Sequence, residues 1–183
     1  TVFGNTDYKK IFNLRYVNIN TKKEFFYSQT KNYVNDFIKL EKKNNSSIIE
    51  VHNRPSYINI INSRLKNKIL TLYFHNDPLS MDGSKTINQR KNLLKSCYKI
   101  IFNSSWSKKR FLEGLENKFV NSNKLLIFYQ SAQKGSLSFL KKKKKWITFV
   151  GKLNKAKGYD VFAKSIIKIL DKYKNWKALI IGD

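Results

Sequence analysis

The sequence predicts an α/β protein in which parallel β-sheets carry helices on both faces. Short apolar runs rich in β-branched residues alternate along the chain with stretches that have the helical period. Most of these runs are continuously apolar, which is typical of strands that are covered on both faces. Because strand, helix and strand in that order place the strands parallel, the alternation favours an open parallel sheet.

Six apolar runs are predicted to be strands. They span residues 48–53, 68–77, 99–104, 124–130, 146–151 and 177–183. The segment "IFNLRYVNI" at 11–19 is a further candidate strand. Ligands of such sheets bind beyond the carboxyl ends of the strands, so the residues that directly follow each run are the first candidates for a site.

Five stretches with helical periodicity lie between these runs. They span residues 28–43, 56–65, 88–97, 105–115 and 159–173. Pro55 suits the first turn of the second helix, and the serines at the start of the fourth can cap its free N–H groups. The fifth has the clearest amphipathic pattern, with Phe162 and Ile166 on one stripe and lysines outside it.

The composition limits the class of protein. The chain has 183 residues, 41% of them hydrophobic, which is enough for one domain and part of another. A single cysteine, Cys97, excludes an internal disulfide and cysteine-paired metal clusters, and it favours a reducing compartment. The net charge of +25 fits either a general compositional bias or a surface for an anionic partner, and both explanations stay open.

The stretch "FVGKLNKAKGYD" at 149–160 joins a predicted strand to the fifth helix. Gly151 allows a sharp turn and a close backbone approach to a ligand, and the helix that follows Gly158 offers free N–H groups. Lys152 and Lys157 add two positive charges, so the stretch could bind a diphosphate. In so basic a chain the same lysines could equally be solvated surface residues, and neither GxxxxGK[ST] nor GxGxxG is present.

Several pieces together resemble family 4 glycosyltransferases of the GT-B fold. "ITFVGKLNKAKGYDVFAKSI" followed by "WKALIIGD" looks like the start of that family's C-terminal domain. Upstream, "IIEVHNRPSY", "LTLYFHND" and "IIFNSSWSKKRFLE" resemble the strand ends of its N-terminal domain, in the same order. Lys152 departs from the family, which usually has arginine there, and "FYQSAQK" stands where the family has an Asn-Gly turn.

The resemblance implies two Rossmann-like domains. Residues 1–130 would form the acceptor-side domain without its first strand, 131–145 a linker, and 146–183 the truncated start of the nucleotide-sugar domain. The chain is therefore expected to be a fragment that lacks both ends and is inactive alone.

The implied activity is a retaining, metal-independent transfer of a sugar from a nucleoside diphosphate sugar to an acceptor hydroxyl. Gly151, Lys152, Lys157 and Gly158 would hold the donor diphosphate, and no separate cofactor is expected. The acceptor would be a cell-surface glycan or a lipid-linked glycan.

On the acceptor side, the candidate catalytic residue is His75, which could orient or deprotonate the hydroxyl because imidazole titrates near neutrality. His52 and Asn103 are the further acceptor-side candidates. Each of the three could instead be structural, as a packed histidine or a helix cap. Asp77 could position His75 or cap the turn before Pro78.

Two other functions remain as alternatives. The charge and the interleaved aromatic residues also suit a nucleic-acid-binding module, although no known recognition motif is present. An inactive transferase-like scaffold is the second alternative. We expect a cytoplasmic location, and peripheral contact with the anionic inner face of a membrane is left open.

Overall fold

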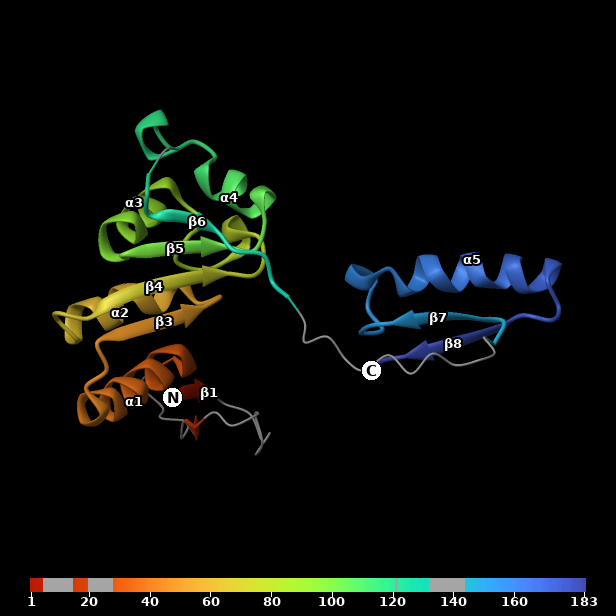
Figure 1. Ribbon diagram of the computed structural model, residues 1–183, viewed down its shortest axis with the longest axis horizontal. Coiled ribbons are helices and arrows are strands. Elements are labelled where there is room, and N and C mark those ends of the chain that lie inside the picture. Colours follow the sequence, from red (N-terminus) through yellow and green to blue (C-terminus); the bar gives the residue numbers. More distant parts are fainter. Residues whose placement is uncertain (5–14, 20–27, 121, 132–143) are drawn as a thin grey trace. The chain divides into compact units, whose positions relative to one another are not determined.

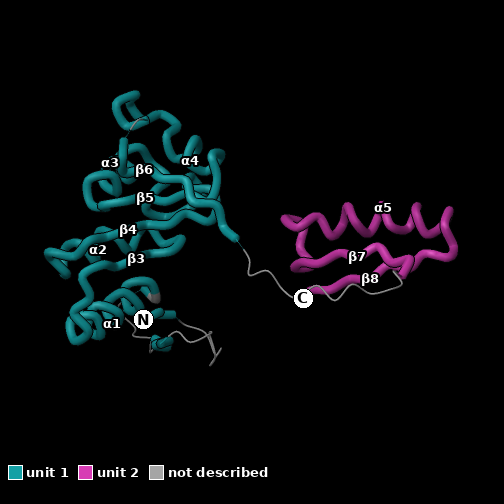
Figure 2. The backbone as a smooth tube through the Cα atoms, in the orientation of Figure 1, with its two compact units in different colours: residues 1–132 teal, residues 133–183 magenta. Residues whose placement is uncertain are grey.

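The computed structural model describes residues 1–4, 15–19, 28–120, 122–131 and 144–183. The chain divides into two compact units, Thr1–Ala132 and Gln133–Asp183, which are described separately below (Figure 2). The boundary between the units falls inside the segment that the sequence predicts as a linker. Residues 132–143 of that linker, with most of its lysine run, lie outside the described residues.

The first unit is built on a four-stranded parallel sheet. Its strands are β3 (Ile48–His52), β4 (Ile69–Phe74), β5 (Lys99–Phe102) and β6 (Leu125–Ile127), in the spatial order β3-β4-β5-β6 (Figure 1). Each neighbouring pair is parallel. All four strands lie within predicted runs, so the predicted α/β class with a parallel sheet is confirmed.

Four helices connect and flank these strands. They are α1 (Gln29–Asn44), α2 (Pro55–Arg64), α3 (Ile87–Ser96) and α4 (Ser105–Leu112), and α2 packs against both α1 and α3. The helices begin where the sequence provides caps. Pro55 occupies the first turn of α2, and Thr86 and Gln89 form a capping box at α3. At α4 the capping side chain belongs to Ser104, one residue before the predicted start of that helix.

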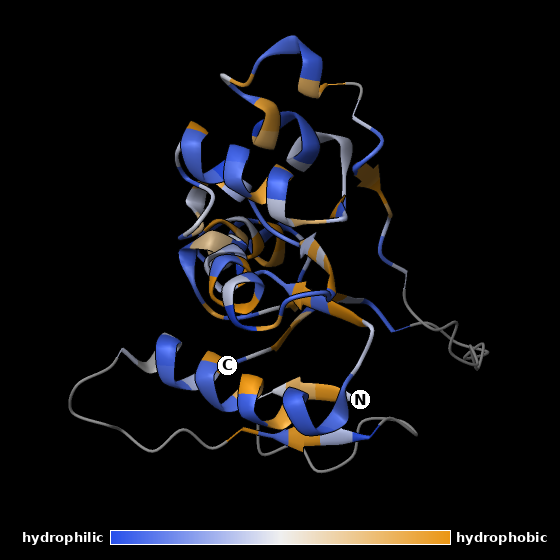
Figure 3. Cartoon of the chain, turned by 90° about the vertical axis from the view of Figure 1, so that its left-hand side faces the viewer, coloured by the Kyte–Doolittle hydropathy of each residue, from blue (hydrophilic) through white to orange (hydrophobic). Residues whose placement is uncertain are grey.

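The core of this unit is aromatic at its centre. Phe74 of β4, Phe102 of β5 and Phe111 of α4 are completely buried, and their ring centroids lie 5.3–5.7 Å apart. The strands are mostly apolar, and the helices are mostly hydrophilic with apolar patches (Figure 3). Burial of the strands therefore holds the sheet and its helices together.

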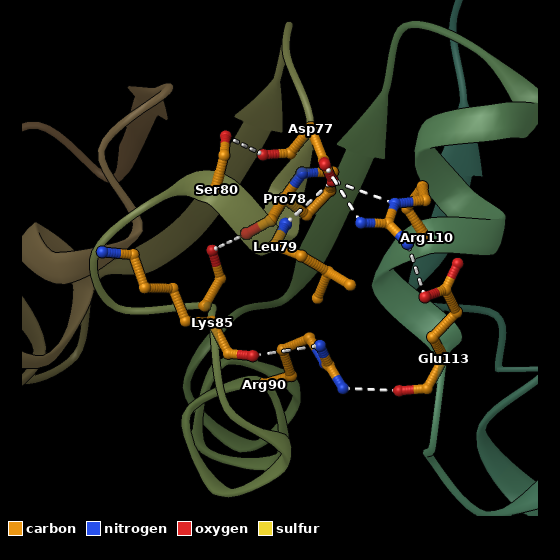
Figure 4. A network of polar contacts seen from close by, with 9 residues as sticks. Asp77, Pro78, Leu79, Ser80, Lys85, Arg90, Arg110 and Glu113 are labelled. Atoms are coloured by element: carbon orange, nitrogen blue, oxygen red, sulfur yellow. Dashed lines mark hydrogen bonds and ion pairs between the residues drawn. The ribbon is translucent and has the colours of Figure 1, made fainter.

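A polar network fixes the connection between β4 and α3 (Figure 4). The carboxylate of Asp77 accepts a hydrogen bond of 3.0 Å from the Leu79 N–H and contacts Arg110 Nη2 at 3.2 Å. Arg110 also pairs with Glu113 at 2.6 Å, and the backbone carbonyl of Glu113 accepts a bond from buried Arg90. Asp77 thus caps the short helix η1 (Pro78–Ser80), which is the second of the two roles that the sequence suggested for it. Its ion pair with Arg110 also links this turn to α4.

Two further short strands lie apart from the main sheet. β1 (Val2–Gly4) and β2 (Tyr16–Asn18) pair in parallel with each other. The strand expected at 11–19 is therefore observed over three residues, and 11–14 lie outside the described residues. Among the described residues, no helix is both long enough and apolar enough to cross a bilayer.

The second unit is a single βαβ element. β7 (Trp146–Val150) and β8 (Lys177–Ile181) pair in parallel, and α5 (Tyr159–Lys172) connects them. Phe149 of β7 packs on Phe162 of α5 with ring centroids 5.3 Å apart. Only one helix covers this strand pair in the described residues, so Val150 and Ile181 remain exposed. Within the described residues of this unit, the expected cover is observed on one face.

Removing one ring of the phenylalanine cluster should destabilise the first unit. We expect Phe102→Ala to lower the free energy of unfolding by about 3–5 kcal/mol, because it leaves a cavity between two rings that cannot close. Phe128→Ala is the matched control, since this side chain is 68% exposed and its loss should change stability by less than about 0.5 kcal/mol. Urea unfolding followed by circular dichroism measures both, and equal losses would contradict the assigned core.

The Asp77 network should make stability depend on pH. Burial opposes ionisation of Asp77, but hydrogen bonds from Arg110 and from the Leu79 N–H outweigh it and hold the pKa of this carboxyl below its ordinary value of 3.8. The stabilisation is thus present above pH 3.8 and is lost as the pH falls through the lower pKa of the folded state. We expect wild type to exceed Asp77→Asn in unfolding free energy at pH 7, and the difference to shrink in acid. A difference that does not depend on pH would contradict this role.

Candidate functional site

Two histidines meet at the carboxyl edge of the four-stranded sheet. His52 is the last residue of β3, and His75 directly follows β4. Parallel pairing places His52 opposite Tyr73, and residues two apart on a strand share a face. Tyr73 and His75 therefore lie on the same side as His52, and the imidazoles come within hydrogen-bond distance.

The histidines belong to a chain of four hydrogen-bonded side chains. Glu50 Oε1 lies 2.7 Å from His52 Nε2, and His52 Nδ1 lies 2.8 Å from His75 Nε2. At the other end, Gln130 Nε2 lies 2.6 Å from His75 Nδ1. Both ring nitrogens of both histidines thus have partners, and the chain crosses from β3 to the residues that follow β6.

Aromatic stacking holds the same rings in place. The ring of Tyr73 lies 4.5 Å from His75 and 5.5 Å from His52, nearly parallel to both. The Tyr73 hydroxyl donates to the backbone carbonyl of Phe128, which anchors the segment after β6. Because Tyr73 is buried, it forms a fixed base for the more exposed imidazoles.

Two asparagines hold the backbone of His75 from the neighbouring strands. Asn53, after β3, accepts a hydrogen bond of 2.8 Å from the His75 N–H, and Asn103, after β5, donates one of 2.7 Å to the His75 carbonyl. Asn53 has a left-handed backbone (φ 52°), a conformation that asparagine adopts more readily than most residues. The observed contacts of Asn103 are thus with the protein, and its contact with an acceptor stays a prediction.

The surroundings of His75 favour its neutral form. Burial lowers the pKa of His75 below the ordinary value of 6.5, and the neighbouring His52 lowers it further, while the hydrogen bond with Gln130 and the charge of Glu50 oppose both. A neutral imidazole can accept a proton, as a general base must.

An open groove of about 940 Å³ lies beside β3 and reaches His52. Glu50, His52 and Asn53 line one part of it. Aromatic side chains from β1, α1 and α2 line another, namely Phe3, Tyr33, Phe37 and Tyr57. The first unit therefore has an open space beside His52 that could receive a larger molecule.

The predicted diphosphate residues surround a turn in the second unit. After β7 the chain passes through Gly151 and Lys152, forms the short helix η3 (Lys155–Lys157) and reaches α5 through Gly158. Asn154 caps η3 by accepting a bond of 3.1 Å from the Lys157 N–H. Gly158 has φ 72°, a left-handed conformation that suits glycine, and α5 then begins without a side-chain cap.

Glycines bring the two strand ends of this unit together. The Gly151 N–H donates to the Ile181 carbonyl at 2.9 Å, and a side chain on Gly182 would collide with the carbonyl oxygen of Gly151. Lys152 and Lys157 are exposed, and neither forms an ion pair among the residues that the structure describes. Among the described residues the turn thus presents two ammonium groups without an ion pair, beside a helix start that has no side-chain cap and carries Asp160 in its first turn.

Other candidate chemistry is limited in the described part of the chain. It contains no group of three or more His, Cys, Asp or Glu side chains suited to a metal ion. Cys97 is buried, and burial raises the pKa of its thiol to about 12, so it remains a thiol at neutral pH as expected of a packed cysteine.

The sequence pointed to His52, His75 and Asn103, and the structure brings all three together at one edge. It did not single out Glu50, Tyr73 or Gln130. Glu50 and Tyr73 stand two residues before a candidate histidine, so strand alternation could have placed them on the same face. Nothing in the sequence could have placed Gln130 against His75, because that contact joins residues 55 positions apart.

A comparison with solved structures finds a shared fold. The chain is similar to the crystal structure of accessory secretory proteins 1, 2 and 3 of Streptococcus pneumoniae, with a TM-score of 0.53 and 10% sequence identity. The match covers 84% of this chain but only 36% of the other, so the chain spans about a third of that neighbour's length. Neither the comparison with protein-family models nor that with curated proteins gives a match.

Asn53 should contribute through its backbone conformation and through its side chain. We expect Asn53→Ala to cost about 2 kcal/mol of unfolding free energy, from backbone strain and from the unpaired His75 N–H. Asn67→Ala is the matched control, because Asn67 is also left-handed (φ 69°), and it should cost about 1 kcal/mol from strain alone. Denaturant unfolding compares the two, and equal costs would contradict a contribution from the Asn53 side chain.

Proposed function

We propose that the chain is part of a glycosyltransferase that moves a sugar from a nucleoside diphosphate sugar to an acceptor hydroxyl. The observation that carries this proposal is the turn from Gly151 to Gly158. In the described part of the chain it combines glycine backbone that a ligand could approach closely, two ammonium groups without ion pairs, and a helix start without a side-chain cap at the carboxyl end of a parallel strand. That combination suits a diphosphate better than a neutral ligand.

On the donor side, Lys152 and Lys157 would stabilise the negative charge that develops on the departing diphosphate. Lysine supplies a mobile charge without the fork of arginine, so binding through Lys152 would be less directional than in most members of the resembled family. The backbone N–H groups at the start of α5 would add the positive end of the helix dipole. No residue of this turn forms a competing ion pair in the described structure.

On the acceptor side, His75 would accept the proton of the attacking hydroxyl. The lowered pKa of His75 and its half-buried place at the sheet edge support this role. The groove lined by aromatic residues fits an acceptor that carries a glycan or a lipid-linked glycan, since sugar faces pack on aromatic rings. The high positive charge would suit docking at the anionic inner face of a membrane.

Removal of one ammonium group tests the donor site. We expect Lys157→Ala to weaken binding of uridine or guanosine diphosphate by about tenfold or more, the effect of losing one charge-assisted hydrogen bond. Lys168→Ala is the charge-matched control, because Lys168 is exposed on α5 more than two turns further along. Isothermal titration calorimetry of both variants and the wild-type chain measures the difference.

Two results would count against the proposal. Equal effects of the two substitutions would show that only overall charge matters. Tight binding of oligonucleotides that falls steeply with salt, without any response to nucleoside diphosphates, would instead favour the nucleic-acid-binding alternative.

A further inference from the structure

Both ring nitrogens of His75 form hydrogen bonds with protein side chains, and the chemistry of these partners decides which nitrogen donates and which accepts. The amide nitrogen of Gln130 faces His75 Nδ1 and can only donate a hydrogen bond, so with this orientation of the amide Nδ1 accepts and carries no proton. In a neutral imidazole the proton then lies on Nε2, which faces His52.

The donor and acceptor roles of His52 and Glu50 follow from the tautomer of His75. His75 Nε2–H donates to His52 Nδ1, so the proton of neutral His52 lies on its own Nε2. That N–H points at the carboxylate of Glu50, which accepts it at 2.7 Å. Every hydrogen bond has one donor and one acceptor when both histidines are neutral and Glu50 is ionised.

We propose that Glu50 and His52 are positioning residues that hold His75 in the tautomer with a free Nδ1 lone pair, and that the Gln130 amide occupies the place of the acceptor hydroxyl. This inference rests on the proposed function, in which His75 is the base. The hydroxyl would displace Gln130 and donate its hydrogen bond to Nδ1 instead.

In the transfer step one bond forms, one bond breaks and one proton moves to His75. The hydroxyl oxygen forms a bond to the anomeric carbon of the donor sugar, and its proton passes to His75 Nδ1. The bond from that carbon to the diphosphate oxygen breaks, and the electron pair leaves with the diphosphate. The resulting imidazolium keeps its Nε2–H bond to His52, and the Glu50 carboxylate at the far end stabilises the positive charge.

The exposure of the residues fits this division of roles. Gln130 is exposed and lies two residues beyond Phe128, whose backbone is anchored by Tyr73, so its side chain can leave without disturbing the sheet. Glu50 and His52 are about half exposed, so their interaction is weakened by solvent and acts chiefly on orientation. Asn53 and Asn103 hold the His75 backbone, and their hydrogen bonds do not depend on Glu50 or Gln130.

The charged and titratable groups around His75 are few. His52 and Glu50 approach from β3, and Tyr73 stacks on the ring from β4. Arg54 bonds the Asn53 carbonyl, and Asp77 is paired with Arg110. Among these groups, Glu50 is the anion that reaches the histidine pair.

Nitrogen-15 NMR of the wild-type chain tests the tautomers directly, because the sequence contains only two histidines. Above the histidine pKa values we expect both rings to be protonated at Nε2. Glu50→Ala should shift His52, and through it His75, towards a mixture of tautomers. Glu50→Gln should restore the wild-type pattern, since its amide oxygen still accepts the bond, and Glu116→Ala is the control for loss of a distant carboxylate.

The position of Gln130 is tested by chemical modification. Diethyl pyrocarbonate reacts with an unprotonated imidazole nitrogen, so Gln130→Ala should speed modification of His75 several-fold and leave His52 unchanged. Circular dichroism verifies that each variant is folded. A proton on Nδ1 of His75, no response to Glu50→Ala, or an unchanged modification rate would each overturn the inference.

These measurements need neither donor nor acceptor. A result against the tautomers can therefore be told apart from a result against the proposed function. The latter would appear as no diphosphate binding through Lys157, while both histidines still carry their protons on Nε2.

Discussion

The parallel pairing of β3, β4 and β5 is the constraint on which the rest of the first unit depends. Because the strands run in one direction and in fixed register, the residues that leave their carboxyl ends all emerge at one edge. His52, His75 and Asn103 are separated by 23 and 28 residues along the chain, yet hydrogen bonds join them through His75. The buried phenylalanine cluster fixes the strands that carry this edge.

The polar groups at this edge serve two purposes that are easily confused. Asn53 and Asn103 form hydrogen bonds with the N–H and carbonyl groups of His75, which lies just beyond the end of β4 and so has no strand partner for them. Glu50, His52 and Gln130 instead engage the imidazoles, where protons can move. A position at a strand end therefore does not by itself show whether a side chain binds backbone groups or an imidazole.

The second unit applies the same topology to different chemistry. Its strand ends carry glycines rather than histidines, and the turn between β7 and α5 carries lysines that form no ion pair with another described residue. The first unit thus offers groups that can exchange a proton, and the second offers groups that can hold an anion. The function proposed for the chain needs one group of each kind, a proton acceptor and an anion-binding turn.

The sequence by itself determined the elements and their parallel arrangement. Continuous apolar runs marked β3 to β8, whereas β1 was not predicted, and Pro55 and the serines before α4 marked helix starts, because these signals are local in the chain. It also indicated His52, His75 and the Gly151–Gly158 turn, since each directly follows an apolar run. Only the tertiary structure decided that the two histidines share a hydrogen bond, that Gln130 reaches His75 and that Asn103 turns inward. These contacts depend on strand register and on side-chain direction across residues far apart in sequence, and no local pattern encodes either.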